Sequence, residues 1–171
     1  MVVVDADDRP IGTVGKLRAH LEGTLHRALS VFVFHPNTGM LLLQKRAADK
    51  YHSGGLWSNS CCSHPRPGEA LADAAHRRLR EELGFDCELE FALTVGYRLP
   101  VGPSLVENEI THVFTGEADV EPAPDPTEVA DVRWIGVPEV VRDLAAHPER
   151  YSPWFGVVFA ELLAAGFVSA T

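Results

Sequence analysis

Cysteine is scarce in this chain of 171 residues, which contains only three. Two of them, Cys61 and Cys62, are neighbours that cannot easily bridge each other, and the spacing matches no disulfide framework. A small secreted domain held together by disulfides is therefore not expected. The cysteine content instead predicts a reducing compartment, the cytoplasm.

Long apolar runs are also missing from the start of the chain, which reads MVVVDADDRP. This stretch carries acids, lacks the basic flank of a secretory signal and is too short for a membrane span. Basic residues are outnumbered, since 15 Lys and Arg stand against 24 Asp and Glu, and the formal net charge is -9. Such a chain is not broadly attracted to nucleic acid or anionic lipid. We expect a soluble protein with no nucleic-acid, membrane or obligatory protein partner, in which a local basic pocket meets any anionic ligand.

Apolar residues make up 46% of the chain, which is enough for one compact domain over residues 1–171. The first two predicted strands, over residues 28–35 and 39–46, are separated by Pro-Asn-Thr and should form an antiparallel hairpin. Ser152 is expected to cap the last helix. The mixture of elements favours an α+β fold, an α/β/α sandwich. Periodicity and turn residues predict strands over 28–35, 39–46, 105–116 and 128–136, and helices over 68–85, 137–147 and 152–166.

The helix that ends before Gly84 is the clearest element of the chain, because glycine suits the left-handed conformation after a helix. Arg78 and Glu82 lie one turn apart on one flank of its apolar stripe, whereas Arg77 and Glu81 are expected to point further towards water. An ordinary ion pair on the helix surface would by itself explain the spacing of Arg78 and Glu82.

This helix and the loop before it resemble the Nudix box, in which a loop and a helix present carboxylates to magnesium on a diphosphate. Two positions depart from that pattern: Ser63 stands in place of the opening glycine, and Arg78 in place of a second glutamate. An arginine can hold a diphosphate but cannot help bind the metal that activates water. The helix is therefore expected to grip a diphosphate without supporting its hydrolysis. The residues that carry the resemblance are Glu69, Arg77, Leu79, Glu81, Glu82, Gly84 and Phe85.

A wider set of motifs is similar to the type 1 isopentenyl-diphosphate isomerase family, and the similarity extends from about residue 2 to residue 155. The resemblance implies a Nudix-like α/β/α sandwich with a mixed, largely antiparallel sheet. It also implies interconversion of isopentenyl diphosphate and dimethylallyl diphosphate without flavin or nucleotide. The motifs are TLHRALSVFVFH (24–35), QKRAADK (44–50), LWSNSCCSHP (56–65), YR (97–98), VENE (106–109) and SPW (152–154).

The same resemblance implies a role for individual residues. Cys62 and Glu109 would act on opposite faces of the substrate, Tyr97 would support proton transfer beside Glu109, and Trp154 would face the five-carbon chain. Magnesium would arrive with the diphosphate, and a second divalent ion would be Mn²⁺, Zn²⁺ or Mg²⁺. The implied metal-site residues are His20, His26, His64, Glu107, Glu109 and Cys62, with Glu82 for the magnesium ion. The implied phosphate-binding residues are Lys16, Arg46, Lys50 and Arg78.

Elementary chemistry supports several of these roles independently. Glu107 and Glu109 are two residues apart, so on a strand both carboxylates leave the same face. A mixed set of imidazoles and carboxylates suits zinc, manganese or magnesium. Moving a double bond by one carbon adds a proton to an alkene and removes another nearby, so an acid and a base must flank the substrate. An indole such as that of Trp154 can stabilise the carbocation formed between these steps.

Two alternatives stay open at this point. A Nudix-type diphosphate hydrolase is favoured by the partial box. A non-catalytic module that binds metal or diphosphate would need neither the thiol of Cys62 nor the carboxylate of Glu109. Which of these two groups donates the proton is equally open.

Overall fold

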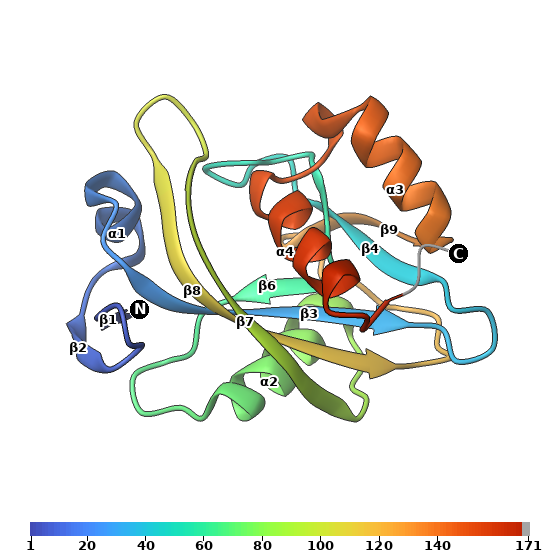
Figure 1. Ribbon diagram of the computed structural model, residues 1–171, viewed down its shortest axis with the longest axis horizontal. Helices are drawn as coiled ribbons and strands as arrows, with labels where there is room; N and C mark the ends of the chain where they lie inside the picture. The colour runs from blue at the N-terminus through green and yellow to red at the C-terminus, as the bar shows by residue number, and fades with distance from the viewer. Residues whose placement is uncertain (169–171) are drawn as a thin grey trace.

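A computed structural model of the chain describes residues 1–168, in which one mixed sheet lies between helices on both faces (Figure 1). Within these residues nine strands contribute to the sheet. The strands are β1 (Val2–Val4), β2 (Pro10–Thr13), β3 (His26–Phe34), β4 (Leu41–Arg46), β5 (Trp57–Ser58), β6 (Cys61–Ser63), β7 (Leu89–Pro100), β8 (Val106–Glu117) and β9 (Val129–Ile135). The helices are α1 (Lys16–Glu22), α2 (Leu71–Leu83), α3 (Val137–Ala146), the short 3-10 turn η1 (Pro148–Arg150) and α4 (Pro153–Ala164).

Strand β3 is the centre of the sheet. It pairs in parallel with β8, from His26 opposite Glu109 to Phe34 opposite Glu117. All its other partners, β1, β4 and β6, are antiparallel to it. The pairs β7 with β8 and β4 with β9 are antiparallel as well. The predicted mixed, largely antiparallel sheet is therefore confirmed.

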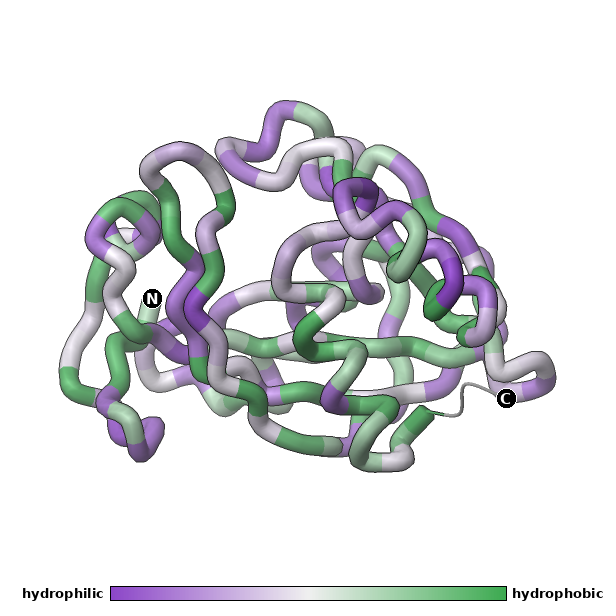
Figure 2. Tube along the Cα trace, turned by 45° about the horizontal axis from the view of Figure 1, so that its top comes forward, coloured by the Kyte–Doolittle hydropathy of each residue, from purple (hydrophilic) through white to green (hydrophobic). Residues whose placement is uncertain are grey.

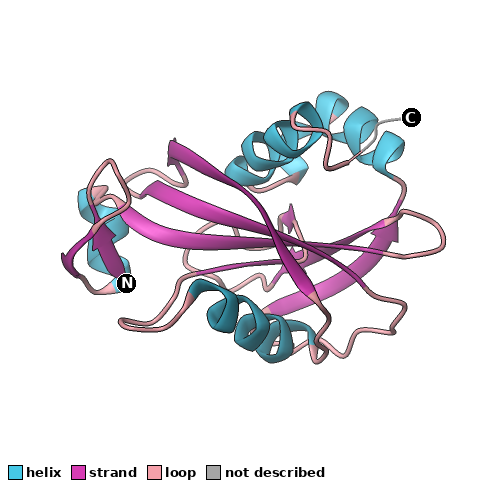
Figure 3. Cartoon of the chain, turned by 60° about the horizontal axis from the view of Figure 1, so that its bottom comes forward, coloured by secondary structure: helices cyan, strands magenta, loops and turns pink. Residues whose placement is uncertain are grey.

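The two faces of the sheet carry separate hydrophobic cores, because alternate residues of a strand point to opposite faces. Helix α2 packs on one face with Leu29, Val31 and Cys61. Helices α3 and α4 pack on the other face with Phe32 and Val113 (Figure 3). The hydrophobic residues are concentrated along the central strands (Figure 2). This arrangement is the predicted α/β/α sandwich.

Helix α2 ends as the sequence predicts. Gly84 adopts a left-handed conformation with φ 75°, and its N–H donates to the carbonyl of Arg80. A side chain at this position would also lie 2.5 Å from the carbonyl oxygen of Ala123. Glycine is thus required here both by its conformation and by the close approach of a neighbouring segment.

The predicted hairpin between the first two strands is only partly correct. Strands β3 and β4 pair at Phe34 and Leu41, next to the turn. Beyond that point they diverge, because β6 pairs with β3 whereas β5 and β9 pair with β4. The divergence places Cys62 opposite Ser30 in the middle of β3.

The predicted N-cap position of Ser152 is confirmed, although its side chain does not cap the helix, whereas the predicted exposure of Arg77 was wrong. Ser152 occupies the N-cap position of α4 but makes no capping bond, because its hydroxyl is hydrogen-bonded to that of Ser58 over 2.9 Å. Arg77 does not point into water, since its side chain is 17% exposed, against 18% for Arg78. The guanidinium of Arg77 instead donates to both carboxylate oxygens of Glu69, over 2.6 and 2.8 Å.

The sequence predicts no element before residue 28 or between residues 86 and 104. Strands β1 and β2 and helix α1 were missed because each is short. Strand β7 was missed because its burial does not alternate regularly, and a register shift between Phe91 and Leu93 explains part of that irregularity. Within residues 1–168 no helix combines the length and the apolar character needed to cross a membrane.

Candidate active site

The register of three neighbouring strands determines which side chains meet at the site. Glu107 and Glu109 are both buried and lie on one face of β8, as their spacing predicts. His26 lies opposite Glu109 across the parallel β3–β8 pair, and Tyr97 lies opposite it across the antiparallel β7–β8 pair. Strand pairing alone therefore gathers residues from three separate segments.

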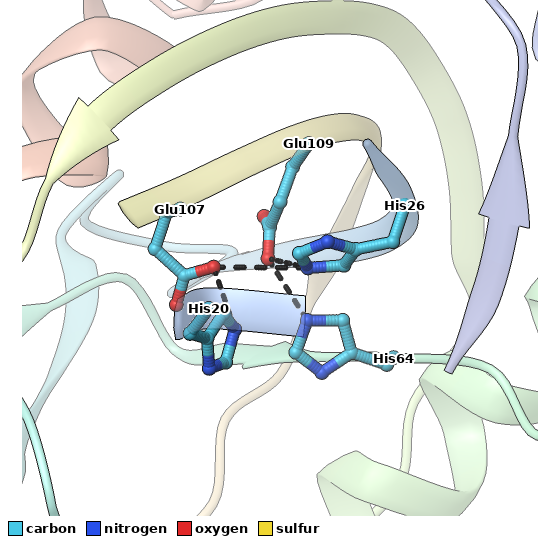
Figure 4. Close-up of side chains that lie close together, drawn as sticks. All are labelled: His20, His26, His64, Glu107 and Glu109. Atoms are coloured by element: carbon cyan, nitrogen blue, oxygen red, sulfur yellow. Dashed lines mark hydrogen bonds and ion pairs between the residues drawn. The ribbon is translucent and has the colours of Figure 1, made fainter. Parts of the chain in front are cut away.

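Two further histidines complete a cluster around these acids (Figure 4). His20 comes from α1 and His64 from the residue after β6. Nε2 of His64 lies 2.9 Å and Nε2 of His26 lies 3.2 Å from Oε1 of Glu109. Nε2 of His20 lies 3.0 Å from Oε2 of Glu107. One potential ligand atom from each of five residues lies within 4.8 Å of the others: His20, His26, His64, Glu107 and Glu109.

The cluster has the chemistry of a cation site. Nε2 of His20 and Oε2 of Glu107 are buried and have no hydrogen-bond partner, although they lie 3.0 Å apart. Nδ1 of His26 lies 2.7 Å from the carbonyl oxygen of Thr24, which can only accept, so Nδ1 carries a proton and the neutral ring offers its lone pair from Nε2. Lone pairs of nitrogen and oxygen thus converge on one small volume. A divalent cation satisfies such a set, whereas buried acceptors left facing each other are costly.

The two carboxylates keep their charge in this buried place. Burial raises the pKa of Glu109 and so does the nearby charge of Glu107, but hydrogen bonds with His26 and His64 outweigh both and lower it. Burial likewise opposes ionisation of Glu107, yet the neighbouring imidazoles of His20 and His52 bring its pKa well below the usual range. Both acids are therefore available as ionised ligands at neutral pH.

Cys62 and Cys61 point to opposite faces of β6. Cys61 is fully buried in the α2 core, where burial raises the pKa of its thiol. Cys62 faces the site, and burial raises the pKa of its thiol to about 11. Its sulfur donates to Oδ1 of Asn59 over 2.8 Å and accepts from Nε1 of Trp154 over 3.2 Å. The site thus holds a protonated thiol in a defined orientation.

The hydrogen bonds of the Asn59 side chain determine which end of its amide is oxygen and which is nitrogen. Its Nδ2 donates to the carbonyls of Val31 and Cys61, over 3.0 and 2.8 Å. Because both carbonyls accept only, the amide oxygen must face the sulfur of Cys62. Asn59 was not among the residues selected from the sequence, since a lone asparagine before two cysteines has no distinguishing pattern.

Tyr97 contacts Glu109, and Trp154 lines the same cavity as that glutamate. The hydroxyl of Tyr97 donates to Oε2 of Glu109, and burial followed by the charge of Glu109 raises the pKa of the phenol. Trp154 is buried at the start of α4, and the guanidinium carbon of Arg46 lies 5.1 Å from its ring centroid. The carboxylate and the indole therefore belong to the same site.

Cys62 and Glu109 line one cavity, together with Trp154, Lys16 and Arg46. The cavity is narrow, about 30 Å³, which is room for about two water molecules. Burial, together with the charges of Lys50 and Arg46, lowers the pKa of Lys16. The shared cavity brings a thiol, a carboxylate, an indole and two basic groups within reach of one small ligand.

A wider cleft of about 700 Å³ lies between the C-terminal ends of β3 and β8 and the start of α3. It is lined by Glu88, Glu90 and Glu117, whose charges would repel an anionic ligand. Size alone therefore does not identify the site for a diphosphate.

Two implied phosphate-binding residues lie outside the narrow cavity. Lys50 and Arg78 both bind Glu128, the second over 3.2 Å. Arg78 also pairs with Glu82, whose other oxygen accepts from Gln44 over 3.0 Å. The structure thus separates the implied basic set into Lys16 and Arg46 in the cavity and a second pair around Glu128.

Two members of the implied metal set stand apart from the five-residue cluster. Cys62 is not a member, and its sulfur is hydrogen-bonded to Asn59 and Trp154. Glu82 projects from α2 and is engaged by Arg78 and Gln44. Conversely, Nε2 of His52 lies 3.1 Å from Oε1 of Glu107, a contact that was not foreseen. His52 has no partner nearby in the sequence that would have revealed it.

Comparison with known proteins connects this geometry with a family. Residues 24–155 match the NUDIX domain. A solved structure of a Deinococcus radiodurans protein superposes with a TM-score of 0.71 at 16% identity, covering 85% of this chain and 88% of that one. A Nudix hydrolase from M. smegmatis superposes with a TM-score of 0.59 at 20% identity, covering 97% and 94%. At such low identities these structures establish the fold alone.

Sequence relatives are far more similar. An isopentenyl-diphosphate Delta-isomerase from Burkholderia multivorans is 54% identical, covering 91% of this chain and 88% of that protein. Isopentenyl-diphosphate Delta-isomerase 2 from Aromatoleum aromaticum is 52% identical, covering 90% and 81%. The isopentenyl-diphosphate Delta-isomerase from Pectobacterium atrosepticum is 45% identical, covering 95% and 90%. The chain therefore belongs to the isopentenyl-diphosphate Delta-isomerase family, whose fold is that of the NUDIX domain.

Proposed function

We propose that this chain is an isopentenyl-diphosphate Delta-isomerase, which interconverts isopentenyl diphosphate and dimethylallyl diphosphate. The names of relatives at 45% to 54% identity support this activity. The observation that carries the mechanism is that Cys62 and Glu109 line one cavity beside Lys16 and Arg46.

The reaction needs two groups that exchange protons with neighbouring carbons. In the proposed mechanism Cys62 and Glu109 are these groups and act on opposite faces of the substrate. The hydrogen bond from Tyr97 to Glu109 orients the carboxylate and can relay its proton. Asn59 and Trp154 hold the sulfur of Cys62 from two sides, so the position of the sulfur beside the cavity is fixed.

A tertiary carbocation forms between the two proton transfers and would react with any water present. The narrow, buried cavity limits water, and the indole of Trp154 offers electron density without a nucleophile. A desolvated cation over an aromatic face gains about 2 kcal/mol. This is a small part of the total barrier reduction of about 8 to 23 kcal/mol typical of enzymes. Orientation of the substrate and proton transfer must therefore supply most of the acceleration.

The proposed metal site consists of the five clustered residues, whose unpaired, converging lone pairs fit a divalent cation. A bound cation would supply positive charge beside Glu109 and favour the ionised form of its carboxylate. Nε2 of His26 and Nε2 of His64 lie beside Oε1 of that carboxylate, while the hydroxyl of Tyr97 donates to Oε2. These contacts direct the plane of the carboxylate into the cavity.

The diphosphate is proposed to bind Lys16 and Arg46, and then Lys50 and Arg78 once these release Glu128. Glu82 would contribute to a magnesium ion that accompanies the diphosphate, again after releasing Arg78. Because the cavity holds only about 30 Å³, the walls around it must move apart to admit a five-carbon chain. The proposed ligand is a small diphosphate, and the reaction needs no nucleic acid, membrane or protein partner.

The test is incubation of the purified protein with isopentenyl diphosphate and magnesium, followed by separation of the products. We expect dimethylallyl diphosphate and no released phosphate. Release of phosphate without isomerisation would instead identify a diphosphate hydrolase, in spite of the arginine at position 78. If neither dimethylallyl diphosphate nor phosphate is formed, the proposal that this chain is an enzyme acting on isopentenyl diphosphate is contradicted.

A further inference from the structure

The loop of residues 47–56, between β4 and β5, approaches the metal-ligand cluster with two adjacent side chains. Nε2 of His52 lies 3.1 Å from Oε1 of Glu107. The hydroxyl of Tyr51 is hydrogen-bonded to Nδ1 of His20, and the two rings stack with centroids 5.6 Å apart. One dipeptide thus contacts two of the five clustered residues.

Both contacts use the atom that does not face the centre of the cluster. Tyr51 binds His20 through Nδ1, and His52 binds Glu107 through Oε1. The atoms left over, Nε2 of His20 and Oε2 of Glu107, are the buried pair without hydrogen-bond partners. When Nδ1–H of His20 donates to the Tyr51 oxygen, the ring lone pair is placed on Nε2, as a metal ligand requires.

The loop is held firmly enough to orient these ligands. Arg46 donates from Nε to the carbonyl of Ser53 over 3.2 Å and from Nη2 to that of His52 over 3.3 Å. Ser53 has a left-handed backbone with φ 52°, which a residue other than glycine adopts only when its surroundings enforce it. A side chain at Gly54 would lie 2.5 Å from the carbonyl oxygen of Ala48. His52 itself is buried and packs edge to face against Trp154, with ring centroids 5.8 Å apart.

We propose that Tyr51 and His52 are positioning residues of the metal site. His52 holds the outer oxygen of Glu107, and Tyr51 holds the outer nitrogen of His20, so that both inner atoms face one cation. This inference rests on the proposed metal site and adds two residues that orient its ligands. The strained loop around Arg46 is the element that fixes both positions.

The test measures binding of Mn²⁺ by the purified protein, with free Mn²⁺ followed by electron paramagnetic resonance, and requires no turnover. His52→Ala and Tyr51→Phe should each weaken Mn²⁺ affinity by about 10- to 100-fold, the usual effect of removing an outer-shell partner. His52→Gln keeps a donor for Glu107 and should retain more affinity than His52→Ala. The matched control is His147→Ala, because His147 is 43% exposed and pairs with Glu149 away from the cluster.

The variant His64→Ala distinguishes a failure of the proposed metal site from a failure of the positioning role of Tyr51 and His52. If His64→Ala binds Mn²⁺ as the parent does, the five-residue metal site is wrong. If His64→Ala loses Mn²⁺ while His52→Ala and Tyr51→Phe keep parental affinity, only the positioning role is overturned. Tyr51→Phe and His52→Gln preserve the size of their side chains, so one of them remains informative if His52→Ala fails to fold.

Discussion

Nε1 of Trp154 donates a hydrogen bond to the sulfur of Cys62 over 3.2 Å. The two residues are 92 positions apart in the chain, and the contact joins the first turn of α4 to β6. The indole therefore both faces the proposed substrate space and orients the thiol.

Trp154→Phe keeps an aromatic ring but removes the donor to Cys62. We expect kcat to fall about tenfold, which corresponds to about 1.4 kcal/mol, with a smaller change in KM. Steady-state kinetics with isopentenyl diphosphate measure both values. Trp134→Phe is the control, because Trp134 packs against His35 on the α2 side of the sheet. Equal kcat values for the two variants would contradict the role of the indole donor.

Cys62→Ala and Glu109→Gln should each abolish turnover while leaving the far-UV circular dichroism spectrum unchanged. The control is Cys61→Ala, since Cys61 points into the α2 core on the opposite face. Cys61→Ala should keep turnover and lower the free energy of unfolding by about 1 kcal/mol. Near-parental turnover in either of the first two variants would remove that residue from the proposed catalytic pair.

His64→Ala should lower the metal content of the purified protein, because its Nε2 lies in the five-residue cluster. Elemental analysis by mass spectrometry checks the metal-to-protein ratio. His76→Ala is the matched variant, since His76 pairs with Asp86 outside the cluster. The ligand assignment fails if both variants retain the parental ratio.

Arg46→Ala should raise KM about tenfold or more for isopentenyl diphosphate, because a charged hydrogen bond to phosphate is worth about 1.5 to 3 kcal/mol. Arg142 is exposed on α3, away from the cavity, so Arg142→Ala should leave KM unchanged. An equal effect of the two substitutions on KM would argue against a basic pocket around Arg46.

Glu69→Gln should destabilise the protein in a way that depends on pH. The hydrogen bonds from Arg77 lower the pKa of Glu69 from 4.5 to about 2. Because the pKa is depressed in the folded state, the stabilisation is complete above pH 4.5 and is lost as the pH falls towards 2. We expect a loss of about 1 to 2 kcal/mol at pH 7 that disappears on acidification.

Urea unfolding at pH 7, 4 and 2.5 provides the measurement for Glu69→Gln. Glu22→Gln is its control, since Glu22 pairs with Arg18 on an exposed face and its side chain is 50% exposed. Such exposed pairs contribute about 0 to 1 kcal/mol. If the free energies of unfolding of Glu69→Gln and the parent differ by the same amount at all three pH values, the ion pair with Arg77 is not the cause of the difference.

Several features could be predicted because they depend on local geometry. The helix ending at Gly84 follows from its apolar spacing and its terminal glycine, and α2 has the predicted end. The common face of Glu107 and Glu109 follows from the two-residue period of a strand. The same period separates Cys61 from Cys62, so only one of the two thiols reaches the site.

Other features could not be predicted from local geometry. The amide of Asn59 is oriented by carbonyls of β3 and β6, and His52 meets Glu107 from a loop 55 positions earlier in the sequence. The position of Arg77 beside Glu69, rather than in water, depends on how the loop before α2 folds back. Such contacts leave no periodic pattern in the chain.

By itself the sequence determined the residue types of the site, the faces on which its strands and helix present them, and the family to which they belong. These properties follow from short-range backbone geometry and from motifs that can be compared directly. Only the tertiary structure decided which atoms meet, because the parallel pairing of β3 with β8 brings His26 beside Glu109 across 83 positions. That pairing is stabilised by two cores on opposite faces of the sheet, and burial by those cores is the sum of many contacts that no single motif specifies.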